Sequence, residues 1–213
     1  MSAAPGGDTH PSLLDLRVRD LLDRFASTDP TPGGGSAAAL SGATGAALVA
    51  MVCAMPKTRT GAAEERGRLD TALRWARESS SRLRGLVDED AAAFDAVMAA
   101  YRLPKATEDE KAERKKAIGA AMSRATQVPA QTAEACLVVM RAAVEAAQYG
   151  NPNALSDART GGAMAWAGLM GAAENVRINV KPDDTASAGL LEVAETALRD
   201  ARALAATLGL TVQ

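Results

Sequence analysis

The chain has 213 residues, of which 47% are hydrophobic and only 3% aromatic, and its formal net charge is −2. This length supports one sizeable core, and the dispersed charges exclude a basic stripe for nucleic acid or a positive block for a membrane surface. We therefore expect one helical domain over residues 12–213, after a disordered tail over residues 1–11, with a small-molecule ligand and no nucleic-acid or membrane partner.

Apolar residues recur every three or four positions, and period-2 alternation is nearly absent, which predicts an all-α fold. Ser12 is the expected N-cap of the first helix. The predicted helices span about residues 12–27, 36–55, 61–102, 107–128, 129–149, 154–180 and 184–208, with a break or kink at Pro129. The expected architecture is a multihelical up-and-down bundle with long helices.

The second predicted helix lies in an uncharged run from Pro30 to Pro56. The run is long enough to span a bilayer, but its Ala, Gly and Ser content is only weakly apolar, which favours a buried helix in a soluble protein. Cys53 and Cys136 have no ligand-type spacing, so we expect both to pack as small hydrophobes in a reducing cytoplasm.

Carboxylates are the main candidates for chemistry, because the sole histidine, His10, lies in the predicted tail and no pattern supports a metal site. Asp90 falls in the middle of an apolar stripe, and Asp157 shares a stripe with Asn175 and Asn179. Burial raises the pKa of a carboxyl group and suits it to act as an acid, a base or a counter-ion to a cation. The alternative is a core aspartate that satisfies a buried helix end.

The stretch from Thr31 to Ser36 reads Thr-Pro-Gly-Gly-Gly-Ser and precedes the uncharged helix. Its unpaired N–H groups suit a carboxylate, a phosphate or a developing oxyanion; the alternative is a tight turn between packed helices. One set of polar side chains either caps helices or binds a ligand through its amides and hydroxyl: Asn153, Ser156, Asn175 and Asn179. A set of cations near helix ends either stays solvated or binds the anionic part of a ligand: Lys57, Arg59, Lys105 and Lys181.

Five ordered segments resemble the cyclodeaminase/cyclohydrolase family over about residues 12–208. They are Thr31–Ser36, Asp88–Met98, Leu103–Lys105, Gly150–Asp157 and Asn175–Asn179. The resemblance implies a multihelical fold, a homodimer, and a folate site in a cleft near the subunit interface that the glycine-rich stretch partly forms. The chain departs from the family pattern at Ala54–Arg59 and at Arg159–Thr160.

The resemblance also implies an enzyme that acts on a folate-borne one-carbon unit, with a tetrahydrofolate derivative as substrate and no metal. The first expectation is methenyltetrahydrofolate cyclohydrolase, which hydrates 5,10-methenyltetrahydrofolate to the 10-formyl form. Formiminotetrahydrofolate cyclodeaminase and a non-catalytic folate-binding or dimerisation module are the alternatives. The expected catalytic residues are Asp90, Asp157 and Lys105. The expected substrate-binding residues are Pro32, Gly33, Gly34, Gly35, Ser36, Lys57, Asn153, Ser156, Asn175 and Asn179.

Overall fold

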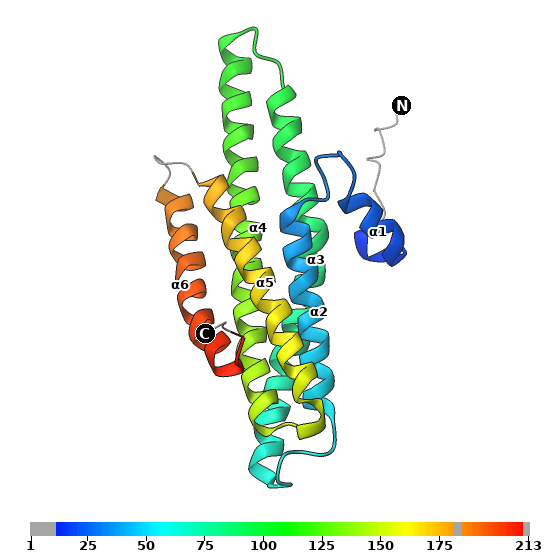
Figure 1. Ribbon diagram of the computed structural model, residues 1–213. Helices are drawn as coiled ribbons and strands as arrows, with labels where there is room; N and C mark the ends of the chain where they lie inside the picture. The colour runs from blue at the N-terminus through cyan, green and yellow to red at the C-terminus, as the bar shows by residue number, and fades with distance from the viewer. Residues whose placement is uncertain (1–11, 181–184, 211–213) are drawn as a thin grey trace, which may run out of the picture.

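The computed structural model describes residues 12–180 and 185–210, and within these ranges it is all-helical, with no strand. The predicted tail over residues 1–11 and Lys181 lie outside the described residues. The elements are η1 (Leu13–Asp15), α1 (Val18–Phe25), α2 (Gly34–Ala54), α3 (Ala63–Arg102), α4 (Glu108–Tyr149), η2 (Pro152–Ala154), α5 (Leu155–Asn179) and α6 (Thr185–Leu208). Figure 1 shows an elongated bundle in which the α3–α4 hairpin extends beyond the other helices.

Helix α2 lies in the body of the bundle and packs most closely against α5, which runs antiparallel to it. A Cβ atom on Gly45 would lie 2.5 Å from the Gly161 carbonyl oxygen, and one on Gly168 would lie 2.6 Å from the Ala38 carbonyl oxygen. Side chains at these positions would therefore push the two helices apart. Among the described residues, α2 alone is long and apolar enough to span a membrane, and half of its most apolar stretch is buried against the rest of the chain.

The N-terminal segment differs from the single helix predicted over residues 12–27. Ser12 does cap a helical turn, because its hydroxyl accepts a hydrogen bond from the Leu14 N–H, but that turn is the 3₁₀ helix η1 and α1 starts only at Val18. The Ser12 hydroxyl also donates to Asp88 Oδ2 at 2.6 Å, and the Leu13 N–H donates to Asp88 Oδ1 at 2.8 Å. Asp88 thus fastens this segment to α3.

A break or kink was predicted at Pro129; the break is wrong, because α4 continues through this residue from Glu108 to Tyr149. A proline has no N–H, so the carbonyl group of Ala125 loses its partner within the helix. The side-chain Nδ2 of Asn179, at the end of α5, donates to that Ala125 oxygen at 2.8 Å. A hydrogen bond from another helix therefore replaces the one that the proline removes.

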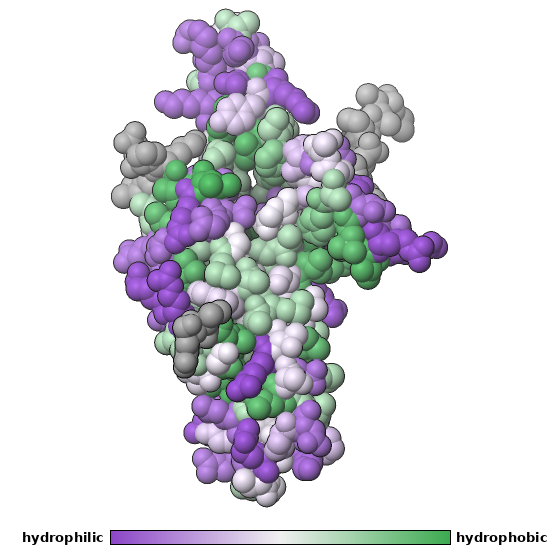
Figure 2. Space-filling model, in the orientation of Figure 1, coloured by the Kyte–Doolittle hydropathy of each residue, from purple (hydrophilic) through white to green (hydrophobic). Residues whose placement is uncertain are grey.

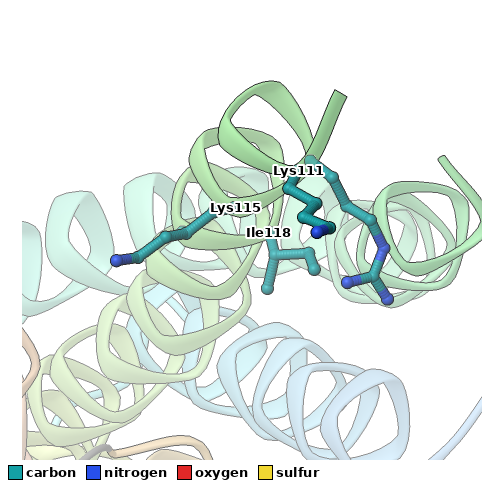
Figure 3. A pocket seen from close by; sticks show the side chains of 5 residues that line it. Lys111, Lys115 and Ile118 are labelled. Atoms are coloured by element: carbon teal, nitrogen blue, oxygen red, sulfur yellow. The ribbon is translucent and has the colours of Figure 1, made fainter. Parts of the chain in front are cut away.

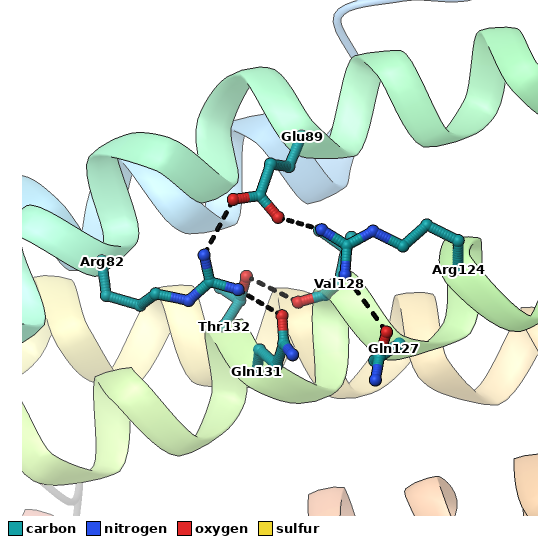
Figure 4. A network of polar contacts seen from close by, with 7 residues as sticks. All are labelled: Arg82, Glu89, Arg124, Gln127, Val128, Gln131 and Thr132. Atoms are coloured by element: carbon teal, nitrogen blue, oxygen red, sulfur yellow. Dashed lines mark hydrogen bonds and ion pairs between the residues drawn. The ribbon is translucent and has the colours of Figure 1, made fainter.

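A polar network joins α3 to α4 on the outside of the bundle (Figure 4). Glu89 accepts hydrogen bonds from both Arg82, at 2.8 Å, and Arg124, and Arg82 also donates to Gln131. Glu89 therefore pairs with one guanidinium group on each of the two helices and ties α3 to α4.

The two cysteines are fully buried, as predicted from their apolar surroundings. Burial raises the pKa of both the Cys53 and the Cys136 thiol to about 12. Both thiols are therefore protonated at neutral pH and behave as small hydrophobic side chains.

Candidate functional site

The first turn of α2 and the carboxylate of Asp90 form the most closely packed polar contact among the predicted site residues. A Cβ atom on Gly35 would lie 2.1 Å from Asp90 Oδ1, so only glycine leaves room for this carboxylate. The Ser36 hydroxyl lies 2.9 Å from the Val87 carbonyl oxygen and 3.0 Å from Asp90 Oδ2. Asp90 therefore occupies the position at the start of α2 for which the sequence left open an anionic ligand or a tight turn between packed helices.

Burial raises the pKa of Asp90 above its usual value of 3.8, whereas hydrogen bonds from the Ser36 hydroxyl and the Ser36 N–H act in the opposite direction. Desolvation is the larger influence, so the carboxyl group holds a proton more readily than an exposed aspartate does. The sequence prediction of a desolvated carboxylate at Asp90 is confirmed. A group of this kind exchanges protons easily and attracts a cationic ligand.

Of the two predicted amides near the end of α5, one lies beside the start of α2 and the other contacts α4. A Cβ atom on Gly34 would lie 3.6 Å from Asn175 Nδ2, which donates to the Gly171 carbonyl oxygen at 2.8 Å. Asn179 is committed to the Ala125 carbonyl group. Asn175 is therefore placed beside the Gly34–Ser36 turn, whereas the Asn179 amide has a structural partner.

A cavity of about 630 Å³ is lined by the N-terminal segment, the Pro30–Pro32 loop and one face of α3. Asp88 and Asp95, which are seven residues apart on α3, both line it. Its volume is in the range that binds small molecules. The helical spacing of Asp88 and Asp95 indicates a shared face, but the packing of η1 against that face has no local signal in the sequence.

The other predicted residues lie at the opposite end of the α2–α5 pair. The antiparallel contacts place Asp157, in the first turn of α5, beside the last turn of α2, about 24 Å along the helix from Gly35. Lys57, Asn153 and Ser156 belong to the same end and are exposed. Within one chain, the structure therefore does not bring Asp157 to Asp90.

Helix α5 is also more open than its sequence predicts. Its apolar residues, such as Trp166 and Leu169, lie opposite a stripe of glycines and predict a helix buried all round. In the structure, however, Met170 is 41% exposed and Ile178 is 77% exposed. At the departure from the family pattern after α2, Arg59 donates to the Ala147 carbonyl oxygen at 2.7 Å, and its N–H donates to the Tyr149 carbonyl oxygen at 2.9 Å. This arginine caps the C-terminus of α4.

Lys105 lies in the loop at the tip of the α3–α4 hairpin, and twelve residues of α3 separate Asp90 from the end of that helix, a rise of about 18 Å. A hollow nearby is lined by Lys111, Arg114 and Lys115 (Figure 3). Lys111 pairs with Glu108 at 2.7 Å, and Arg114 donates to the Tyr101 carbonyl oxygen. Lys105 therefore does not reach Asp90 within the chain. In the described ranges, no three His, Cys, Asp or Glu side chains group to hold a metal ion.

Comparison with known proteins agrees with this fold and these motifs. The sequence pattern of the formiminotransferase-cyclodeaminase family matches residues 17–195. A methenyltetrahydrofolate cyclohydrolase of Methylorubrum extorquens is 44% identical over 172 residues, which are 80% of this chain and 83% of that protein. A formimidoyltransferase-cyclodeaminase of Rattus norvegicus is 36% identical over 181 residues, 83% of this chain but only 33% of the rat protein.

The crystal structure of a formiminotetrahydrofolate cyclodeaminase from Thermotoga maritima superposes with a TM-score of 0.79 at 25% sequence identity, covering 92% of this chain and 95% of that one. Sequence and fold thus agree over the same helices, including the glycine-rich start of α2 and the α3 segment that carries Asp90. On this evidence the chain belongs to the formiminotransferase-cyclodeaminase family.

Proposed function

We propose that this chain is a folate one-carbon enzyme whose main activity is that of a methenyltetrahydrofolate cyclohydrolase. The 44% identity to the Methylorubrum extorquens cyclohydrolase, over 83% of that protein, supports the activity. The observation that carries the proposal in the structure is the desolvated Asp90 carboxyl group, seated on Gly35 without a cationic partner among the described residues. The methenyl substrate carries an amidinium-like positive charge, which the Asp90 carboxylate would attract.

In the proposed reaction, Asp90 acts on the carbon between N5 and N10 of the folate. The ionised carboxylate stabilises the cation and accepts a proton as water adds to that carbon. The carbon–N5 bond then breaks, N5 gains a proton, and the product is the N10-formyl compound. Overall, one water is consumed and one proton is released. The raised pKa places Asp90 nearer to the pH at which it exchanges protons effectively.

Formiminotetrahydrofolate cyclodeaminase activity is the second candidate, supported by the Thermotoga maritima structure and the Rattus norvegicus sequence. The two activities separate in one assay. Loss of methenyl absorbance measures hydration, and release of ammonia from the formimino substrate measures cyclodeamination. Binding of either folate with turnover of neither would replace both proposals with a folate-binding module.

We also place a homodimer in this proposal, formed through the uncovered face of α2 and α5. Helix α2 has no charged residue, Met51 is 42% exposed and Met170 on α5 is 41% exposed. Figure 2 shows pale green, weakly apolar side chains over the middle of this face. Apolar side chains left exposed on a charge-free helix are typical of a subunit interface.

An antiparallel two-fold arrangement would also bring separated residues together. The Asp157 end of one subunit would face the Asp90 end of the other, across a distance that a single chain cannot close. We therefore assign Asp157, Lys57, Asn153 and Ser156 to the partner's half of each site, and Lys105 to a flanking role.

Mixing two inactive variants tests this assignment. If Asp90→Asn and Asp157→Asn subunits exchange at random, half of the dimers are mixed and each has one intact site, so about a quarter of wild-type activity returns. If each site were formed by one chain alone, mixing the two variants would restore no activity. Sedimentation equilibrium of each variant checks that the dimer and its fold survive the substitution, and a monomeric wild-type protein would refute the shared site.

A further inference from the structure

Ser36, in the first turn of α2, was expected among the substrate-binding residues, but within the chain it has no solvent-exposed surface. Its hydroxyl oxygen lies 2.9 Å from the Val87 carbonyl oxygen and 3.0 Å from Asp90 Oδ2, both of which belong to α3. A hydroxyl group has one hydrogen, so at any moment it donates fully to only one of these two oxygens. The structure thus places one donor between two acceptors.

The Val87 carbonyl group does not depend on the Ser36 hydroxyl. Val87 lies inside α3, and the regular pattern of an α-helix pairs its carbonyl oxygen with the N–H of Ala91. A carbonyl oxygen has a second lone pair, which is the one that Ser36 uses. The hydroxyl can therefore turn away from Val87 without leaving an unpaired buried group.

The two protonation states of Asp90 favour opposite orientations of this hydroxyl. When Asp90 is ionised, the hydroxyl hydrogen points to Oδ2, because a hydrogen bond to a charged acceptor is roughly twice as strong as one to a neutral carbonyl group. When Oδ2 carries a proton, that proton is donated to the Ser36 oxygen, and the hydroxyl hydrogen turns to Val87. Every hydrogen has an acceptor in both states, and a rotation about one bond separates them.

The surroundings of Asp90 leave this exchange to Ser36. Helix α2 has no charged residue, and α5 brings the neutral Asn175 to the same turn. The charged neighbours on α3 are Asp88, which binds the N-terminal segment, and Glu89, which pairs with one arginine of α3 and one of α4 (Figure 4). Within residues 12–180 and 185–210, Ser36 alone donates hydrogen bonds to the Asp90 carboxyl group.

We infer that Ser36 is a positioning residue for the proposed base, and that its hydroxyl reverses its hydrogen bond between Asp90 and Val87 as Asp90 gains and loses a proton. This inference rests on the proposed folate activity. As water adds to the substrate, its proton passes to Asp90 Oδ2 and the hydroxyl turns to Val87. When that proton leaves for N5 or for solvent, the hydroxyl turns back. No bond of Ser36 breaks, and Asp90 is the group of the protein that changes its charge.

The ¹³C signals of carboxyl and carbonyl groups test this reversal without any turnover. In wild-type protein, the Val87 carbonyl signal should move with the same pH midpoint as the Asp90 carboxyl signal, because this carbonyl group loses its second hydrogen bond when Asp90 ionises. In Ser36→Ala, Asp90 should still titrate, but the Val87 signal should lose most of its movement. The Met164 carbonyl group, to which the Ser41 hydroxyl of α2 donates at 2.8 Å, is the matched control and should stay constant. A Val87 signal that does not titrate, or that titrates equally in Ser36→Ala, overturns the inference.

The pH profile of kcat/KM measures what the hydroxyl contributes to the base. Ser36→Ala removes a hydrogen bond that favours the ionised carboxylate, so the pKa of Asp90 should rise and the midpoint of the acid limb should move up by about one pH unit. After correction for the uncatalysed reaction, hydration should fall about tenfold below both midpoints and less than about threefold above them. Ser41→Ala, the same substitution on the same helix, should leave the midpoint in place. An equal loss of activity at every pH would show a purely structural role and refute the inference.

The two experiments also separate this inference from the proposed function. If the Val87 and Asp90 signals titrate together but the protein turns over neither folate, the proposed function fails and the hydroxyl reversal stands. If methenyltetrahydrofolate is hydrated while the Val87 signal stays constant through the titration of Asp90, the proposed function stands and the reversal is refuted.

Discussion

Replacing Asn179 with alanine tests whether this residue is part of the fold or of the ligand site. Its Nδ2 donates to the Ala125 carbonyl oxygen at 2.8 Å, the group that Pro129 leaves without a partner in α4. An unsatisfied buried carbonyl group costs about 1–3 kcal/mol. In a chain of this size, that loss corresponds to a fall in Tm of roughly 2–12 °C.

The sharper form of this experiment is a double-mutant cycle with Pro129→Ala. Alanine at position 129 restores an N–H that bonds to Ala125, so the Asn179→Ala substitution should then cost less than about 0.5 kcal/mol. Urea unfolding at one fixed protein concentration measures the four free energies. If Asn179→Ala lowers the free energy of unfolding equally in the wild-type and Pro129→Ala backgrounds, the structural role is refuted. A rise in KM without loss of stability would show that Asn179 contacts the substrate instead.

Four further substitutions test two carboxylates and two glycines. Gly35→Ala should displace Asp90 and lower kcat by about 100-fold or more, as loss of a positioned acid–base group does. Gly67→Ala on α3 is the control: its Cβ atom would meet no atom within 4 Å, so urea unfolding should show a protein more stable by up to about 1 kcal/mol. The folded-state pKa of Asp90 lies above 3.8, so wild-type protein loses stability as pH rises from 3.8 through that raised pKa. Asp90→Asn cannot titrate there, and unfolding experiments should show that it gains stability relative to wild type over the same range. A difference that stays constant with pH would contradict the burial argument. Hydrogen bonds from Thr58, Thr60 and Gly61 lower the pKa of Glu65 to about 2. The stability that this carboxylate contributes is therefore present above pH 4.5 and lost as pH falls toward 2. A plot of Tm against pH for Glu65→Gln should lack that decline.

The helices and the unusual environment of Asp90 follow from local spacing, which is why the sequence predicts them. An apolar stripe fixes which face of a helix is buried, so a carboxylate in that stripe must be desolvated. Which end of the bundle a residue occupies depends instead on the direction of its helix. With alternating directions, the start of α2 meets the end of α5, so Asn175 lies beside Gly34 while Asp157 lies at the other end.

The continuity of α4 shows a different limit of the sequence. A proline normally ends or bends a helix because it removes one hydrogen bond and crowds the preceding turn. The compensating donor, Asn179, is 50 residues away from Pro129 and belongs to another helix. No window around Pro129 contains this information, so the local rule, which predicted a break or kink, could not exclude the break.

The occupied start of α2 also bears on which ligands the site accepts. A helix N-terminus with three glycines is suited to an anion, but in this chain Asp90 fills that position and receives the Ser36 N–H and hydroxyl. The protein therefore turns an anion-binding element into a fixed negative charge of its own. A neutral or anionic group would gain little from Asp90, whereas an amidinium-like cation gains an attraction that grows as water is excluded. The raised pKa follows from the same geometry, because without a bound cation the hydrogen bonds from Ser36 compensate only part of the cost of burying this carboxylate. Binding of a cationic folate should accordingly lower the pKa of Asp90, and a titration of its carboxyl signal by NMR with and without ligand would detect the shift.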